Sequence, residues 1–166
     1  MDILLDRQSV RKYTEGSVKE EDLDYILRSA MSAPSANNRR PWYFLIIRDK
    51  DNLKKTAGIH SSAQMILEAP LAILVLGDED KSYQGYLPQD LSAATENILL
   101  AAAAKGYGAV WCGIYSNKER EEKFSQFFNL PKNIKAFSLI VIGKPAEEAK
   151  PKDRFDPEKI KYEAWK

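Results

Sequence analysis

The feature that most constrains the fold of this sequence is a long apolar helix pattern from Pro88 to Lys105. Leucine, isoleucine, alanine and threonine recur there at helical spacing and form a broad apolar face. Gly106 and Gly108 follow at once, and glycine is the common residue just past a helix C-terminus. A helix with so wide an apolar face needs other elements to cover it, so we expect the chain to fold around this segment.

The rest of the chain alternates helical and strand patterns. Apolar runs predict strands over residues 42–47, 71–76, 109–115 and 136–142, and helical spacing predicts helices over residues 19–31, 49–67 and 118–128. A capping box, Ser17 with Glu20, is expected to open the first helix, and Gly58 to break the second. Residues 32–41 and 77–85 are expected loops. With no repeat and no linker, residues 1–166 are expected to form a single domain, a sandwich of helices around one sheet.

After Gly143 the pattern gives way to a charged, proline-punctuated tail, residues 145–166. Such a tail is either disordered or packed against something else. Phe155, Tyr162 and Trp165 favour packing, because disordered tails seldom carry aromatic residues. We therefore expect this extension to lie against another subunit.

Composition excludes several classes of function. A net charge of +1 in 166 residues gives no reason to expect a nucleic-acid binder. Cys112 is the only cysteine and His60 the only histidine, which excludes a disulfide framework and a Cys- or His-rich metal centre. No apolar run approaches the roughly 20 residues of a membrane span, and the N-terminus lacks a signal-peptide pattern. A cytoplasmic location is expected.

Three polar clusters could carry binding chemistry. Arg7-Gln8-Ser9-Val10-Arg11 offers two guanidinium groups and a hydroxyl to a phosphate, although it could equally be a solvated first turn. The segment 33–42 holds Asn37 and Asn38, whose amides suit the edge of a heterocycle, or it is only an ordered loop. Lys152-Asp153-Arg154 is a second basic cluster, or part of a solvated tail.

Taken together, these clusters resemble a known family. The chain carries R-x-S-x-R, then A-P-S-x-x-N-x-x-P-W, then the apolar helix opened by Asp90, and finally K-x-R. This order resembles the nitroreductase family of flavoproteins over essentially the whole chain. The resemblance implies an α+β fold in which helices flank a central mixed or antiparallel sheet. It also implies an intertwined homodimer with FMN held at the subunit interface.

The resemblance also implies roles for individual residues. Arg7 and Ser9, with Lys152 and Arg154, would hold the FMN phosphate, and Gln8 would lie against the ribityl chain or ring. Arg11 would stabilise negative charge at the N1 and O2 edge of reduced flavin. The remaining expected flavin contacts are Asn38 on the pyrimidine edge, Pro34, Ser35 and Ala36 from the other subunit, and the backbone of Cys112 and Gly113 near N5.

The implied activity is ping-pong transfer of hydride from NAD(P)H through flavin N5 to small acceptors such as nitroaromatics or quinones. No acid–base dyad is expected, because the flavin carries the chemistry. The same scaffold supports dehalogenation and ene reduction, and a non-enzymatic flavin carrier or sensor is the alternative of another class. The chain departs from the family pattern at Arg40, where glutamine is usual. Tyr83 and Tyr86 lie in a loop that could reach the substrate.

Overall fold

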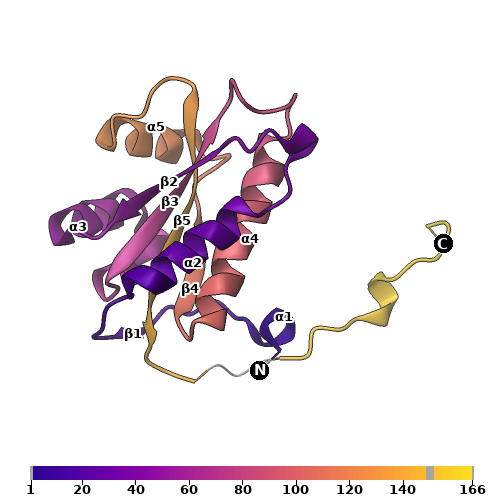
Figure 1. Cartoon of the computed structure of the whole chain (residues 1–166), viewed down its shortest axis with the longest axis horizontal. Coiled ribbons are helices and arrows are strands. Elements are labelled where there is room, and N and C mark those ends of the chain that lie inside the picture. The colour runs from indigo at the N-terminus through magenta and orange to yellow at the C-terminus, as the bar shows by residue number, and fades with distance from the viewer. Residues whose placement is uncertain (1, 149–151, 166) are drawn as a thin grey trace.

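The computed structural model describes residues 2–148 and 152–165, which form a five-stranded sheet between two layers of helices (Figure 1). The strands are β1 (Tyr13–Thr14), β2 (Trp42–Ile47), β3 (Leu71–Asp78), β4 (Gly108–Gly113) and β5 (Ile134–Pro145). β5 is the hub, because β1, β3 and β4 all pair with it, and β2 pairs with β3. Every strand pair is antiparallel, and Ser9 adds an isolated parallel bridge to Ala109.

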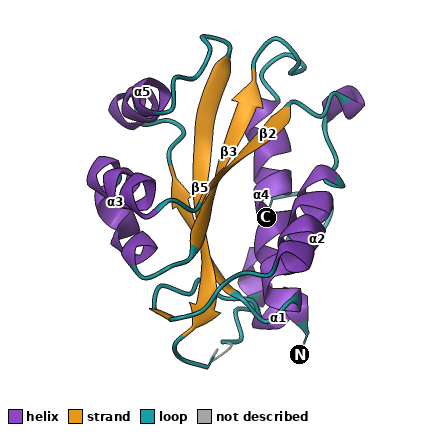
Figure 2. Ribbon diagram, turned by 60° about the vertical axis from the view of Figure 1, so that its left-hand side comes forward, coloured by secondary structure: helices purple, strands orange, loops and turns teal. Residues whose placement is uncertain are grey.

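Helices cover both faces of the sheet (Figure 2). On one face lie α2 (Glu20–Met31) and α4 (Leu87–Ala104). On the other lie α3 (Lys50–Ile59), the 3-10 helix at Ser61–Leu67, and α5 (Lys118–Phe127).

Side chains of β3 alternate between the two layers. Ile73 and Val75 join the core beneath α2 and α4, while Leu74 and Leu76 join the core beneath α3 and α5. Because both faces are buried, the strand reads as an unbroken apolar run instead of an alternating one.

Most of the expected elements are present. The strand at residues 42–47 is found unchanged, and the apolar helix begins one residue earlier than expected, at Leu87. Gly106 follows that helix with a φ of +79°, a left-handed conformation that glycine adopts without strain. The expected break in the 49–67 helix occurs at His60, two residues after Gly58.

Other expectations were wrong in detail. The capping box is absent, because Lys19 is the N-cap of α2 and no side chain caps that helix. The expected strand 109–115 ends at Gly113, and the expected strand 136–142 runs instead from Ile134 to Pro145. Four short elements were not predicted: α1 (Ile3–Asp6), β1, the 3-10 helix at Ala36–Asn38 and the 3-10 helix at Pro157–Lys159. Segments of two to four residues carry no period that a pattern could detect.

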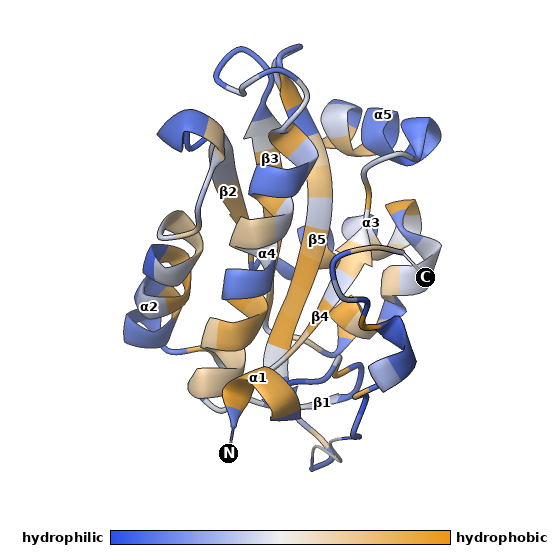
Figure 3. Ribbon diagram, turned by 90° about the vertical axis from the view of Figure 1, so that its right-hand side faces the viewer, coloured by the Kyte–Doolittle hydropathy of each residue, from blue (hydrophilic) through white to orange (hydrophobic). Residues whose placement is uncertain are grey.

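The two ends of the chain expose apolar surface. α1 is apolar and lies beside the C-terminal half of α4 (Figure 3), and Leu4 and Leu5 in it are exposed. Residues 152–165 extend away from the body of the protein (Figure 1), with Phe155 and Trp165 73% and 88% exposed. Residues 149–151 and 166 of the predicted extension lie outside the described residues. Within the described chain, no helix has the length and apolarity needed to cross a bilayer.

Candidate functional site

The outer edge of β4 is open at its C-terminal end. Ile114 donates its N–H to Phe137 O at 3.0 Å, towards β5, so the neighbouring Gly113 directs its own backbone groups to the opposite side. Ala109 faces that same side, where its carbonyl accepts from Val10 N at 2.9 Å. Beyond this contact no strand of the described chain pairs with β4 on its outer edge.

Neither the backbone conformation nor the packing of the chain requires glycine at position 113. Its φ is not positive, and a Cβ placed there would meet nothing within 4 Å. A glycine that neither the backbone nor the packing requires is typical of a place where a ligand approaches the main chain closely. The edge of β4 at Gly113 is therefore a candidate binding surface.

The basic N-terminal segment lies at the other end of the same edge. Ser9 forms the bridge to Ala109, and Arg7 makes an ion pair through Nε with Glu96 Oε1 of α4 at 3.2 Å. Gln8 lines a cavity of about 390 Å³ with Ala103 and Gly108. Arg7, Gln8, Ser9, Cys112 and Gly113 are thus gathered along β4.

Arg11 and Cys112 are coupled electrostatically. The Cys112 thiol is 6% exposed and packs into the core beneath α3 and α5. Burial raises the pKa of this thiol, and the guanidinium groups of Arg11 and Arg120 oppose that rise. A buried thiol with a raised pKa is poorly placed to act as a nucleophile, and the Cys112 backbone is paired with Leu139 of β5.

Two residues that the sequence did not connect with the site hold Gly113. His60 Nε2 lies 2.9 Å from Gly113 O, and Arg120 Nη1 donates to the same oxygen at 2.6 Å. The histidine is only 2% exposed. Burial lowers its pKa, and the nearby Arg120 guanidinium acts in the same direction. The break in helical pattern around residue 60 was the only available signal.

The segment 34–40 forms a rigid turn at the start of α4. Ala36 donates its N–H to Asp90 Oδ1 at 2.9 Å, and Arg40 donates its N–H to Ser35 Oγ at 2.9 Å. Asn37, Asn38 and Arg40 have φ values of +50°, +54° and +49°. Several left-handed non-glycine residues in one turn are unusual and are held by surrounding structure, which is common at functional sites.

Within one chain, the turn at residues 34–40 does not lie beside the basic segment at residues 7–11. Ala36 is tied to Asp90, whereas Gln8 shares its cavity with Ala103. Thirteen residues of helix at 1.5 Å each separate those two anchors by about 20 Å. Lys152 and Arg154 are exposed on the extended tail and do not join either group. Tyr83 and Tyr86 lie near the start of α4, with ring centroids 5.8 Å apart.

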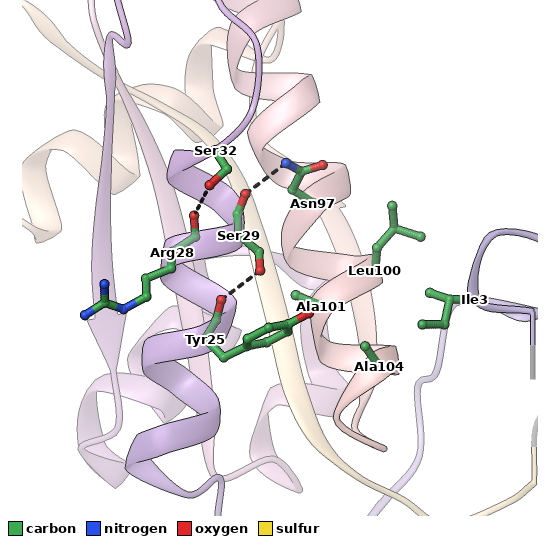
Figure 4. A pocket seen from close by; sticks show the side chains of 9 residues that line it. All are labelled: Ile3, Tyr25, Arg28, Ser29, Ser32, Asn97, Leu100, Ala101 and Ala104. Carbon is green, nitrogen blue, oxygen red and sulfur yellow. Dashed lines mark hydrogen bonds between the residues drawn. The ribbon is translucent and has the colours of Figure 1, made fainter.

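An open groove of about 540 Å³ lies on the surface where α2 packs against α4 (Figure 4). Ile3 faces Leu100 and Ala104 across it, and Asn97 Nδ2 closes one side by donating to Ser29 O at 2.8 Å. With exposed Leu4 and Leu5 beside it, the groove adds to an apolar surface of the kind that protein partners cover. Among the described residues, no three His, Cys, Asp or Glu side chains cluster as metal ligands.

Comparison with known proteins identifies relatives of the whole chain. The family model "Nitroreductase family" matches residues 4–65 and 60–144. A Methanothermobacter thermautotrophicus protein named "Putative NADH dehydrogenase/NAD(P)H nitroreductase" is 42% identical over 160 residues, which is 96% of this chain and 84% of the relative.

Two solved structures share the fold over nearly their full lengths. A "Putative NADH Oxidase" from Clostridium acetobutylicum superimposes with a TM-score of 0.95 at 41% identity, covering 99% of this chain and 100% of the other. A "putative nitroreductase in complex with fmn" from Desulfovibrio desulfuricans has a TM-score of 0.85 at 29% identity, covering 99% and 96%. The expected α+β fold with helices on both faces of the sheet is confirmed.

Proposed function

The chain belongs to the nitroreductase family, and from that membership we propose that it is an FMN-dependent oxidoreductase that takes electrons from NADH or NADPH. Its relatives carry NADH dehydrogenase and NAD(P)H nitroreductase in their names, and one was crystallised with FMN. The electrons would pass to small acceptors such as nitroaromatics or quinones.

The observation that carries this proposal is the unpaired edge of β4 at Gly113. A flavin ring needs a surface where a backbone N–H can approach it without side-chain obstruction, and at Gly113 the N–H is directed to the outer edge of β4 and the position of a Cβ is open. Arg7 and Ser9 lie further along the same edge, where they would hold the phosphate. Arg11, whose charge acts on the Cys112 thiol, would face the N1 side of the ring. The donors available therefore match the acceptors of FMN.

FMN would supply the redox chemistry by accepting a hydride from reduced nicotinamide and returning electrons to the second substrate. The residues of this chain would bind the cofactor, orient it and set its electrostatic field. Arg11 would place a fixed positive charge near N1, where it favours the reduced cofactor. His60 and Cys112, both buried, would take no direct part in the chemistry.

We further propose that the site is completed by a second copy of the chain, with FMN at the interface. The 34–40 turn and the basic segment are anchored near opposite ends of α4, and we infer that each flavin meets the basic segment of one copy and the turn of the other. The exposed α1, the α2–α4 groove and the aromatic residues of the tail supply apolar surface that a partner would cover. Lys152 and Arg154 would reach the phosphate only through such packing of the tail.

The proposed binding mode is tested by titrating FMN into the protein and following the quenching of flavin fluorescence. Saturation at one FMN per chain is expected, and removal of Arg7 or Arg11 charge should weaken binding. Absence of saturable binding would overturn the proposal, and the basic residues would then need another anion.

A non-enzymatic flavin carrier or sensor is the alternative of a different class. It would bind FMN equally well, but it would leave the flavin oxidised when NADH or NADPH is added. Arg11 favours the enzyme over the carrier, because a positive charge near N1 stabilises reduced flavin and a protein that only binds or carries FMN does not need that effect. Rapid mixing of the FMN complex with each nucleotide distinguishes the two, since only the enzyme bleaches within the time of a catalytic turnover.

A further inference from the structure

Gly113 has a backbone that is costly to hold in one conformation. Glycine loses more conformational freedom on ordering than any other residue, and this one has no side chain to pack and lies at the end of a strand. A backbone N–H that is to meet one atom of a ligand must nevertheless be fixed in direction. We therefore expect other residues to make contacts that restrain the Gly113 backbone.

Two side chains from different elements make these restraining contacts. His60 lies at the junction between α3 and the following 3-10 helix, where its own N–H donates to Thr56 O at 3.1 Å. Arg120 lies in the first turn of α5, which Asn117 caps through a bond to Arg120 N at 2.9 Å. Both side chains reach the Gly113 carbonyl, at 2.9 and 2.6 Å.

His60 makes a hydrogen bond through its ring, as a donor from Nε2. A carbonyl oxygen only accepts, so Nε2 carries a proton, and burial, which lowers the pKa of the ring, favours the neutral form without a proton on Nδ1. Nδ1 is buried and has no hydrogen-bond partner among the described residues. The ring packs edge-on against Phe124 of α5, with centroids 6.4 Å apart, so its orientation is fixed.

From these contacts we propose that His60 and Arg120 are positioning residues that aim the Gly113 N–H at the flavin N5 atom. This inference rests on the proposed function, since it needs FMN at the β4 edge. On one side the Ile114 N–H is bound to Phe137 O at 3.0 Å, and on the other Cys112 is paired with Leu139 of β5. With its carbonyl held as well, Gly113 has little freedom left to turn its N–H away.

The test compares FMN with 5-deaza-FMN, in which a C–H group replaces N5 and cannot accept a hydrogen bond. A net hydrogen bond of about 1 kcal/mol corresponds to roughly fivefold in affinity, so the wild-type protein should bind FMN about fivefold more tightly than 5-deaza-FMN. Loss of fold integrity would weaken both ligands alike. The ratio of the two dissociation constants therefore reports on the N5 contact alone.

Four variants complete the experiment. His60→Leu and Arg120→Met each remove one donor, and each should bring the ratio down towards 1. His60→Gln keeps an N–H near the position of Nε2 and should preserve the wild-type ratio. Ile98→Val loosens the opposite core, beneath α2 and α4, and leaves His60, Phe124 and both donors in place, so it should lower thermal stability while leaving the ratio unchanged.

The outcomes separate the inference from the function on which it rests. If the wild type binds neither ligand, the proposed function is overturned and the inference with it. If it binds both ligands equally, FMN binding stands and the N5 contact of Gly113 is wrong. If the wild-type ratio is near fivefold and stays so in both His60→Leu and Arg120→Met, the contact exists but these residues do not position it.

Discussion

His60 is buried beside a guanidinium group, and its ring is held neutral by that environment. Burial is the largest cause that lowers the pKa of His60, and the positive charge of Arg120 lowers it further. A histidine in the unfolded chain has an ordinary pKa of about 6.5. The folded and unfolded states therefore bind different numbers of protons at mildly acidic pH, which makes folding stability depend on pH.

The sign of this dependence is fixed by the lowered pKa. Below about pH 6.5 the unfolded state takes up a proton that the folded state refuses, so stability falls as the pH drops from that value towards the folded pKa. His60→Gln does not titrate and should lose this part of the pH dependence. Urea unfolding of both proteins between pH 7.5 and about pH 5 measures it. Parallel pH profiles would contradict the assigned state of His60.

Arg7 provides a second test at the level of one residue. Arg7→Gln should weaken FMN binding by about tenfold or more, because a charge-assisted hydrogen bond contributes about 1.5–3 kcal/mol. Riboflavin lacks the phosphate, so its affinity should not change. Arg48→Gln makes the same change of net charge just after β2, at the sheet edge opposite β4, where Arg48 pairs with Glu20, and serves as the control.

An equal loss of riboflavin and FMN affinity in Arg7→Gln would contradict a phosphate role. So would an equal loss of FMN affinity in Arg48→Gln, because the effect would then follow net charge alone.

At the level of elements, periodic patterns explain what could be predicted. The 42–47 strand and the long helix were found because their apolar spacing reflects burial against the sheet. α1 and β1 are too short to show a period. The Ser17–Glu20 capping box was wrong because Lys19, two residues after Ser17, takes the N-cap position of α2.

The site was predicted less completely than the fold. Arg7, Ser9 and Gly113 were assigned to the site through their resemblance to family motifs, and their roles stay predictions. The contact of His60 with Gly113 joins residues 53 positions apart, and no local pattern encodes such a contact. Nor could spacing reveal that the Asp90 carboxylate, recognised only as the opening of the helix, holds the 34–40 turn through Ala36.

Asp90 gives the prediction that belongs to this scale. Asp90→Ala removes the acceptor for Ala36 N–H and should lower the free energy of unfolding by about 1–3 kcal/mol. Asp90→Asn keeps an acceptor oxygen and should lose clearly less. Ser92→Ala on the same helix removes only a local bond to Pro88 O and serves as the control. Equal losses in Asp90→Ala and Asp90→Asn in urea unfolding would contradict the role of this bond.

For the whole molecule, the proposed function implies a flavin site that two chains share. The turn at residues 34–40 and the segment at residues 7–11 belong to different ends of α4, and the tail leaves the body of the chain. A two-fold dimer in which each chain lends its turn to the other's β4 edge would give two equivalent sites. The surplus apolar surface of α1 and the tail would then be covered.

Mixed dimers test this arrangement directly. Arg7→Gln damages the basic segment, and Ala36→Glu should damage the turn by adding bulk and negative charge. In a dimer with one chain of each kind, one site contains both defects and the other contains neither. Tandem-tag purification of mixed dimers should therefore recover about half of the wild-type number of tight FMN sites. Recovery of none would mean that each site is built within one chain.

The central claim, an FMN oxidoreductase driven by reduced nicotinamide, is tested most directly by one visible absorption measurement. The purified protein is saturated with FMN, freed of excess cofactor, and its spectrum is recorded anaerobically before and after addition of NADH and, separately, NADPH. We predict a bound flavin spectrum that bleaches with at least one nucleotide and returns when a quinone or nitroaromatic acceptor is added. A protein that retains no FMN, or one whose bound FMN stays oxidised with both nucleotides, would contradict the claim.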